Sequence, residues 1–475
     1  MDRYNLRVDQ ILNPKPKPKP SRLARVWRSL RSPLQLLGDL PSIPIAASDI
    51  SVLNAPSDFR EKLLELIAGA RSRILIAALY LQDDDAGREV LSALYAAKQA
   101  QPQLEIGVFV DWHRAQRGLI GKARSEGNAA LYRQMAERLG AGVTVYGVPV
   151  QRREFMGVLH LKGFVIDDCV LYSGASLNDV YLHRHDRYRL DRYHLIRSAA
   201  LADCMANFLT KTIRDNPAVH ALDCGSVPKT ASIRNQIVSF RRLLAGSRYH
   251  FEDGDLRPGE VGITPLAGLG IRANPLNTAI LQLIQQARKR IIVFTPYFNL
   301  PGPLSRALDS RIKAGCHVTI VLGDKTANDF YIPPDEPFKA IGALPYLYEA
   351  NLRRFCKTRR EAIDAGNLDI HLWRHESNTF HLKGLLVDDD YALLTGNNFN
   401  PRAWRLDLEN GLLIHDPAKL LLAQHQAELG RILAHTRHLS SHSELDSVDS
   451  YPPRVQRLIR RLARFRADRL VNQVL

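Results

Sequence analysis

The chain has 475 residues, of which 45% are apolar and 24% charged, so it is long enough and apolar enough to form more than one sizeable core. The sequence has no apolar run near the ~20 residues needed to span a bilayer, and its N-terminus lacks the apolar core of a signal peptide. The five cysteines are scattered, which predicts reduced thiols in a cytoplasmic protein.

The net charge of +16 is concentrated at the two ends of the chain. Residues 1–32 carry +7 and residues 451–475 carry +6, which leaves about +3 for the long middle. A nuclease is expected to line its central cleft with positive charge. The distribution therefore disfavours a nucleic-acid partner.

Residues 1–50 are expected to form a basic arm rich in Pro, Lys and Arg. The stretch PKPKPKP (14–20) favours extended polyproline II, because proline fixes φ and lacks a backbone donor. The following SRLARVWRSLRS (21–32) predicts either a short amphipathic helix or a solvated basic tail.

The rest of the chain contains two similar halves. The stretch LLELIAGARSRILIAALYL (63–81) matches ILQLIQQARKRIIVFTPYF (280–298), and each predicts a helix followed by a buried strand. The match continues through second strands at 104–111 and 316–324, and through third strands at about 143–146 and 368–373. This order predicts an α/β fold with two similar mixed-sheet domains in a pseudo-twofold arrangement, extended by basic termini. The expected divisions are a first domain at 51–217, a connecting segment at 218–260, a second domain at 261–435 and a C-terminal basic amphipathic helix at 436–475.

The most specific signal is a nine-residue motif that occurs twice. HLKGFVIDD begins at His160 and HLKGLLVDD begins at His381. Each copy is followed by a segment of glycine and small polar residues, SGASLND (173–179) and TGNNFNP (395–401). Residues two apart in a strand share a face, so the histidine and lysine of each copy are expected to point to the same side.

Two such motifs facing each other supply what phosphodiester exchange requires. One histidine attacks phosphorus and forms a covalent phosphoryl-enzyme intermediate. The other protonates the leaving oxygen and later deprotonates the incoming nucleophile. Lys162 and Lys383 stabilise the charge on the non-bridging oxygens, and an aspartate orients an imidazole. No metal and no other cofactor is required, and no His, Cys or carboxylate cluster has the spacing of a metal site.

The doubled pattern H-x-K-x(4)-D, followed by glycine and asparagine, resembles the phospholipase D superfamily over most of residues 50–430. The resemblance is closest to the bacterial phosphatidylserine synthases of the phospholipase D type. It implies transfer of a phosphatidyl group from CDP-diacylglycerol to L-serine with release of CMP, through a covalent phosphatidyl-histidine intermediate. It also implies a cytoplasmic protein that associates peripherally with an anionic membrane surface, at the inner face of the plasma membrane. The stretches that carry this closer resemblance are VDWHRAQRG (110–118), YSGASLNDVYLHRHDRYRLDRYHL (172–195), GDKTANDFYIPPDEPFKAIGALPYLYEANLRRF (323–355) and TGNNFNPRAWRLDLEN (395–410).

The resemblance also implies roles for individual residues, with His160 favoured as the nucleophile. The implied catalytic residues are His160, Lys162, Asp167, His381, Lys383 and Asp388.

Small polar residues after each motif are candidates for phosphate contacts. Ser176 and Asn398 have matching offsets from their glycines, as do Asn178 and Asn400, and the sequence leaves open which member of each pair contacts phosphate. Glu409 is a candidate to orient a catalytic histidine.

Polar residues just past the strand ends give a weaker signal. Asp111 and Arg114 in the first half, and Lys325, Asn328 and Asp329 in the second, could bind the cytidine, the pyrophosphate or serine, or could be caps and turn residues. The candidate substrate-binding residues are Ser176, Asn178, Asn398, Asn400, Glu409, Asp111 and Arg114.

The C-terminal stretch PPRVQRLIRRLARFRADRLVNQVL (452–475) predicts an amphipathic helix with an apolar stripe. The stripe either docks on the protein core or lies among the acyl chains of an anionic leaflet. The second alternative assigns membrane binding to Arg457, Arg460, Arg461 and Arg464.

The same paired motifs also serve other reactions in the superfamily. A phospholipase D or a cardiolipin synthase would share the chemistry up to the intermediate and differ only in the second nucleophile. A nuclease is the third alternative, and the near-neutral middle of the chain disfavours it.

Overall fold

The computed structural model describes residues 37–118, 126–333 and 335–464. The chain divides into two units, residues 1–40 and residues 41–475. In the first unit Leu37–Asp39 forms a short 3-10 helix. The polyproline stretch and the helix predicted at 14–32 lie outside the described residues.

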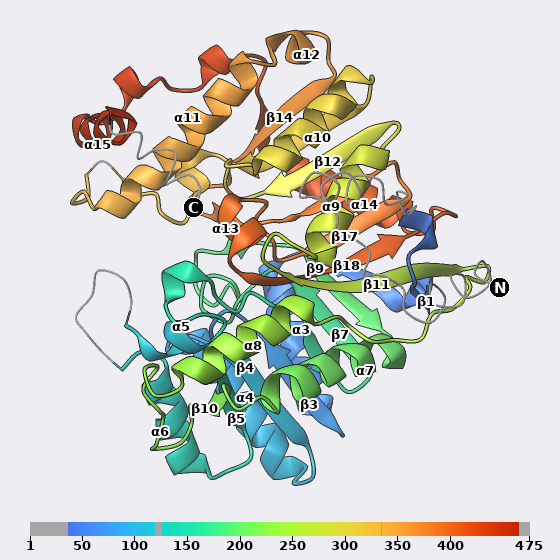
Figure 1. Cartoon of the computed structure of the whole chain (residues 1–475), viewed down its shortest axis with the longest axis vertical. Helices are drawn as coiled ribbons and strands as arrows, with labels where there is room; N and C mark the ends of the chain where they lie inside the picture. The colour runs from blue at the N-terminus through green and yellow to red at the C-terminus, as the bar shows by residue number, and fades with distance from the viewer. Residues whose placement is uncertain (1–36, 119–125, 334, 465–475) are drawn as a thin grey trace, which may run out of the picture. The chain divides into compact units, whose positions relative to one another are not determined.

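Each half predicted from the sequence forms one mixed sheet (Figure 1). The two sheets share the same central strand order. The order β5-β4-β3-β6-β7-β9 of the first sheet is repeated as β14-β13-β12-β16-β17-β18 in the second, with parallel pairing in the first three strands and antiparallel pairing in the rest. The first sheet contains, in spatial order, β10 (His220–Ala221), β5 (Thr144–Val148), β4 (Glu105–Asp111), β3 (Arg73–Ala77), β6 (Phe164–Ile166), β7 (Cys169–Ser173), β9 (Tyr193–Arg197) and β2 (Ile50–Leu53). The second contains β1 (Ile43–Ala46), β11 (Glu260–Leu269), β18 (Leu408–His415), β17 (Tyr391–Thr395), β16 (Gly384–Val387), β12 (Arg290–Thr295), β13 (His317–Gly323), β14 (Leu368–Trp373) and β19 (Thr436–His438).

Alternating side chains of the central strands enter two different cores. On β3, Ile74 and Ile76 pack in the core that contains residues of helices α3 (Pro56–Gly69) and α4 (Asp85–Ala100), while Leu75 and Ala77 belong to a second core. Because both faces are covered, the strand reads as a continuous apolar run in the sequence.

The second core joins the two halves. It contains Leu75 and Phe109 from the first sheet and Phe294, Leu394 and Leu412 from the second. The two repeats are therefore joined through a shared apolar core, and residues 41–475 form a single unit.

Helices connect the strands of both halves. The helices of the first half and the connecting segment are α3 (Pro56–Gly69), α4 (Asp85–Ala100), α5 (Trp112–Gln116), α6 (Ala129–Leu139), α7 (Ala199–Asn207) and α8 (Arg234–Gly246). Those of the second half and the C-terminus are α9 (Pro275–Gln286), α10 (Gly302–Lys313), α11 (Leu344–Lys357), α12 (Arg360–Asp364), α13 (Pro401–Arg405), α14 (Leu422–Leu433) and α15 (Pro453–Arg464).

Two of the expected boundaries were wrong by several residues. Ile43–Ala46, which the sequence placed in the basic arm, forms β1 and pairs with β11. Thr436–His438, which it placed in the C-terminal segment, forms β19 and pairs with β14. Both are short edge strands, of four and three residues, so their periodicity gave little signal.

The motif histidines and lysines lie just before strands β6 and β16, where the sequence predicted them within the strands. A glycine follows each lysine and adopts positive φ, at +109° for Gly163 and +143° for Gly384. A Cβ atom would lie 2.4 Å from Met205 Cε at the first position and 2.6 Å from the Leu393 carbonyl oxygen at the second. Glycine is therefore required at both strand entries.

Candidate active site

The two motif histidines are fixed by backbone pairing between the halves. The His160 amide donates to the Leu408 carbonyl at 2.9 Å, and the His381 amide donates to the Leu190 carbonyl at 2.8 Å. Leu408 begins β18, and Leu190 ends the short strand β8 (Arg189–Leu190), which pairs with β15 (Thr379–Phe380). Each histidine thus belongs to one half and is positioned by the other.

An acidic side chain from the opposite half meets each histidine. Glu409 Oε2 lies 2.8 Å from His160 Nδ1, and Asp191 Oδ2 lies 3.5 Å from His381 Nδ1. The registers of β9 on β7 and of β18 on β17 make the two acids equivalent in the repeat. Sequence reasoning found Glu409 and missed Asp191. The pattern acid-x-x-x-Leu-Ile, shared by DRYHLI (191–196) and ENGLLI (409–414), is the signal that could have identified it.

Both imidazoles are buried, and burial favours their neutral form. Burial, followed by the charges of Lys162 and Lys383, lowers the pKa of His160 well below its usual value. Burial and Lys383 lower the pKa of His381 to about 4. Burial raises the pKa of Glu409, whose Oε2 lies 2.8 Å from His160 Nδ1. This contact at Nδ1 leaves Nε2 of His160 for the reaction.

The two motif lysines are buried and lie close to the other polar groups of the site. Lys162 Nζ lies 3.5 Å from Ser176 Oγ, and Lys383 Nζ donates to Asp191 Oδ2 at 2.9 Å and contacts His381 Nδ1. Burial and the neighbouring charge of Lys383 lower the pKa of Lys162 to about 7. Two ammonium groups near one point are suited to hold an anion such as a phosphodiester.

Each motif is followed by a segment with a glycine, and this glycine makes room for the lysine of the other motif. A Cβ atom on Gly174 would lie 2.7 Å from the Asp191 carboxylate and 3.0 Å from Lys383 Nζ. A Cβ atom on Gly396 would lie 2.7 Å from Lys162 Cγ. These close approaches explain why both segments have glycine at their second position.

The two motif aspartates do not orient the histidines, and this part of the prediction was wrong. The Asp167 carboxylate accepts hydrogen bonds from the backbone amides of residues 71–73 and from the Ser72 hydroxyl. Asp388 accepts from the backbone amides of residues 288–290 in the same way. Both lie at the turn beyond β6 or β16, at the end away from the histidine, and fasten that turn to the start of β3 or β12. The repeated motif therefore contains both a reacting histidine and an aspartate that holds the turn in place.

The polar residues after the motifs divide into two kinds. Ser176 contacts Lys162, and the Asn398 side-chain oxygen is buried without a hydrogen-bond partner in the described structure. Asn178 accepts from the Tyr181 amide, and Asn400 caps α13 by accepting from the Ala403 amide. Asn178 and Asn400 therefore have local structural roles, and Ser176 and Asn398 stay candidates for substrate contacts.

Asp111 and Arg114 were predicted to contact substrate, and the structure gives them other partners. The Asp111 carboxylate caps α5 by accepting from the His113 and Arg114 amides, and it also accepts from the Leu159 amide at 2.9 Å. Arg114 lies 3.5 Å from Glu154. Asp111 therefore positions the backbone beside His160, and Arg114 takes part in a half-exposed ion pair.

Asp329 joins the site beside His381. Its Oδ2 accepts from the Tyr297 hydroxyl at 2.8 Å and lies 3.8 Å from His381 Nε2, and its Oδ1 lies 2.9 Å from Arg189 Nε. The Tyr181 hydroxyl lies 2.9 Å from His381 Nδ1. The sequence indicated Asp329 only as a weak candidate and assigned no role to Arg189 or the two tyrosines, which lie in the two-residue strand β8, in a turn and in a bend.

Lys325 and Asn328, the other weak candidates, lie elsewhere. Lys325 Nζ binds Glu349 at 3.1 Å and contacts Asp446, and the Asn328 side chain accepts from the Phe330 amide. Both residues therefore have structural partners.

Two groups of side chains among residues 37–118, 126–333 and 335–464 have the arrangement of metal ligands. One is Asp369, His371 and His438, and the other is Asp85, Asp179 and His185. Neither group contains a motif histidine. The sequence predicted no cluster at metal-ligand spacing, because residues of each group come from distant parts of the chain.

No helix in the described part of the chain combines the length and the apolar character needed to cross a bilayer.

Two like halves that bring paired imidazoles and paired ammonium groups to one buried site define a phosphodiester-transferring enzyme. Comparison with known proteins agrees with this class. Residues 280–433 match the family model described as "Cardiolipin synthase, PLD-like domain". The CDP-diacylglycerol–serine O-phosphatidyltransferase of Escherichia coli (strain K12) is 52% identical over 93% of this chain and 98% of its own length.

Two comparisons with Haemophilus influenzae give the same result. The CDP-diacylglycerol–serine O-phosphatidyltransferase of that organism is 47% identical over 93% of this chain and 98% of its own length. A crystal structure of the phosphatidylserine synthase of Haemophilus influenzae superposes with a TM-score of 0.90 at 46% identity, covering 92% of this chain and 98% of that chain. The chain belongs to the phospholipase D-type family of CDP-diacylglycerol–serine O-phosphatidyltransferases.

Proposed function

We propose that the protein transfers a phosphatidyl group from CDP-diacylglycerol to L-serine, giving phosphatidylserine and CMP. The observation that carries the proposal is the pair of buried histidines, each held at Nδ1 by an acid from the opposite half. Relatives that are 52% and 47% identical over nearly their whole length bear the name of this activity.

In the first step, Nε2 of His160 attacks the phosphorus of the phosphatidyl group. The N–P bond forms as the bond from phosphorus to the bridging oxygen breaks, and CMP leaves with that oxygen. The hydrogen bond between His160 Nδ1 and Glu409 stabilises the positive charge that develops on the imidazole of His160. His381, held by Asp191, lies in the opposite half and protonates the leaving group.

In the second step, the intermediate passes its phosphatidyl group to serine. Neutral His381 takes the proton of the serine hydroxyl, the hydroxyl oxygen attacks phosphorus, and the N–P bond to His160 breaks. The low pKa of His381 in the free protein suits this role as a base, and the negative charge of bound phosphate raises that pKa when an acid is needed.

Charge on the non-bridging oxygens is stabilised by the two lysines. Lys162 and Lys383 are buried, so their attraction for an anion is weakly screened. The Ser176 hydroxyl beside Lys162 is placed to donate to the same oxygens, whereas the unpaired Asn398 oxygen accepts from a donor group of the substrate.

Release of CMP from CDP-diacylglycerol, measured with and without serine, tests the function. We expect rapid CMP release with serine and phosphatidylserine as the lipid product. Glycerol and water are tested as competing acceptors of the phosphatidyl group. Preferred transfer to glycerol would indicate a cardiolipin synthase, and preferred transfer to water would indicate a phospholipase D. A preference for either over serine would overturn the proposal.

We also propose that the protein acts on an anionic membrane surface at the cytoplasmic side, with α15 as one contact. Val455, Leu458 and Ile459 of α15 pack in a cluster with Ala343 and Tyr346, so this part of the apolar stripe docks on the protein. Its arginines at 457, 460 and 461 are exposed, and the side chain of Arg464 lies outside the described residues. An arginine near an anionic leaflet contributes about 1 kcal/mol of attraction.

A further inference from the structure

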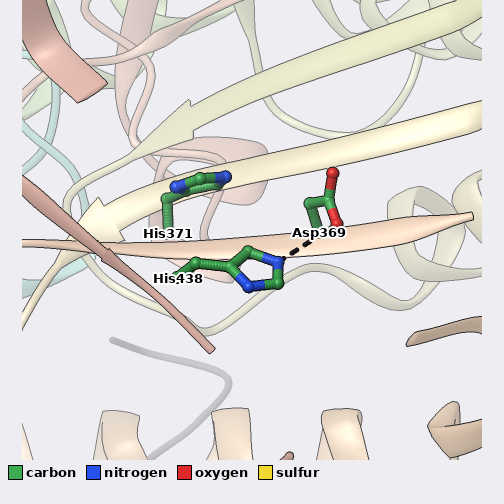
Figure 2. A group of neighbouring side chains, drawn as sticks. All are labelled: Asp369, His371 and His438. Atoms are coloured by element: carbon green, nitrogen blue, oxygen red, sulfur yellow. Dashed lines mark hydrogen bonds and ion pairs between the residues drawn. The ribbon is translucent and has the colours of Figure 1, made fainter. Parts of the chain in front are cut away.

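A cluster of metal-binding side chains lies at one edge of the nine-stranded sheet. Asp369 and His371 lie two residues apart on β14 and so share a face, and His438 of the edge strand β19 is paired directly with His371. Figure 2 shows the three side chains beside one another, with His438 hydrogen-bonded to Asp369. Each side chain offers one ligand atom, and these atoms all lie within 4.8 Å of one another.

The contacts around the cluster orient its side chains for binding. His371 Nδ1 lies 3.1 Å from the Thr436 hydroxyl, which leaves Nε2 as the ligand atom. His438 Nε2 lies 3.2 Å from Asp369 Oδ1. A third imidazole, His317 on β13, places Nε2 2.9 Å from Asp369 Oδ2. The contacts from Thr436 and His317 are of the kind that fix the tautomer of an imidazole and the direction of a carboxylate in metal sites, whereas the His438–Asp369 bond joins two of the candidate ligands.

We propose that Asp369, His371 and His438 bind a divalent transition ion of the zinc class. Two imidazoles and one carboxylate suit Zn²⁺, Co²⁺ or Ni²⁺, whereas Mg²⁺ and Ca²⁺ prefer oxygen ligands. His317 holds the second oxygen of Asp369, or becomes a fourth ligand after a small rotation. The set has the His₂-carboxylate composition of an open zinc site.

The location of the site gives the ion a structural role. Trp373 ends β14 and lies four residues after Asp369, which is roughly 13 Å along the strand. Trp373 packs against Phe380, the residue before His381, so the cluster lies at the end of β14 away from the catalytic histidine. The ion would link β14 to β19, the edge strand that leads into the C-terminal segment carrying α15. Metal binding therefore stabilises the attachment of this segment and leaves the chemistry of the paired motifs unchanged.

Titration of the whole, tag-free protein with Co²⁺ tests the site, because the visible spectrum of Co²⁺ reports its coordination. We expect one equivalent to bind with a four-coordinate spectrum, and Zn²⁺ to displace it. His371→Gln and His438→Gln should each weaken binding by about 100-fold or more, and His317→Gln by about 10- to 100-fold.

His185→Gln is the matched control, because His185 belongs to the second, more exposed group and lies 3.0 Å from Asp85. It should bind Co²⁺ as wild type does. Zn²⁺ at a hundredfold excess over its Kd should raise the unfolding midpoint by about 3 °C in wild type and in the control, and not in His371→Gln. The proposal is overturned if wild type binds no Co²⁺, or if His371→Gln and His438→Gln bind it as tightly as wild type.

Discussion

At the scale of single residues, the structure separates the acids that serve the histidines from those that serve the fold. Glu409→Gln and Asp191→Asn remove the carboxylates that meet His160 and His381, and each should lower kcat by about 10²-fold or more. Glu409→Gln should change stability little, whereas Asp191→Asn also leaves buried Lys383 without its ion-pair partner and should lower stability. Steady-state CMP release, together with thermal unfolding of the same preparations, measures both quantities.

The motif aspartates are the matched controls. Asp167→Asn and Asp388→Asn keep a side chain that tolerates positive φ, so they test the hydrogen bonds to the backbone amides. We expect each to cost about 2 kcal/mol of stability, with turnover of the folded protein within a few-fold of wild type. Loss of turnover in Asp167→Asn without loss of stability would restore the aspartate to the catalytic set.

The lysines are expected to act as charges in the transition state. Lys162→Ala and Lys383→Ala should each lower turnover by about 10²-fold or more, because each removes one partner of the non-bridging oxygens. Lys→Arg should not restore full activity, because a planar guanidinium replaces a compact ammonium group in a buried space. Near-normal turnover in a well-folded Lys→Ala variant would mean that this lysine is structural.

At the scale of elements, the apolar and the basic residues of α15 are expected to have different roles. Its described apolar residues pack on the protein, so binding to liposomes should depend on the arginines and be released by salt. A variant with Arg457, Arg460, Arg461 and Arg464 changed to Gln should float less with anionic liposomes than wild type, yet stay active on detergent-dispersed substrate.

A variant with the same loss of charge elsewhere is the control for α15. Arg71, Arg272, Arg288 and Lys289 are exposed, and changing them to Gln should leave flotation near the wild-type level. Equal loss of flotation in the two variants would show that net charge alone attracts the protein to the membrane.

The elements also show what the sequence could and could not predict. The helix and strand repeats at 63–81 and 280–298 were predicted from apolar periodicity, and they form α3 with β3 and α9 with β12. The two histidines and Glu409 were predicted from the motif and from the resemblance. Asp191 and the roles of the motif aspartates could not be predicted, because they depend on which side chains the two halves bring together across their shared core.

At the scale of the whole molecule, buried imidazoles make the free energy of unfolding depend on pH. Burial lowers the pKa of His194 to about 3, against about 6.5 in an unfolded chain, and neither ring nitrogen has a hydrogen-bond partner in the described structure. The folded protein holds this imidazole neutral. The stabilisation is therefore complete above pH ~6.5 and is lost progressively as the pH falls toward 3.

Replacing His194 with Leu removes this contribution. Between pH 6 and 4, the slope of the unfolding free energy with pH should be smaller than in wild type by ~1.4 kcal/mol per pH unit, which corresponds to one proton. Denaturant unfolding at a series of pH values measures the slope. An unchanged slope would mean that His194 is already protonated in the folded protein.

The central claim is that the two halves assemble one site in which one histidine carries the phosphatidyl group and the other moves the proton. The most direct measurement is acid trapping of the protein with labelled CDP-diacylglycerol in the absence of serine, for wild type, His160→Ala and His381→Ala. The account predicts label on wild type at His160, no label on His160→Ala, and label at a reduced rate on His381→Ala, together with exchange of labelled CMP into the lipid by wild type. Equal labelling of the two variants, or the absence of CMP exchange in wild type, would contradict it.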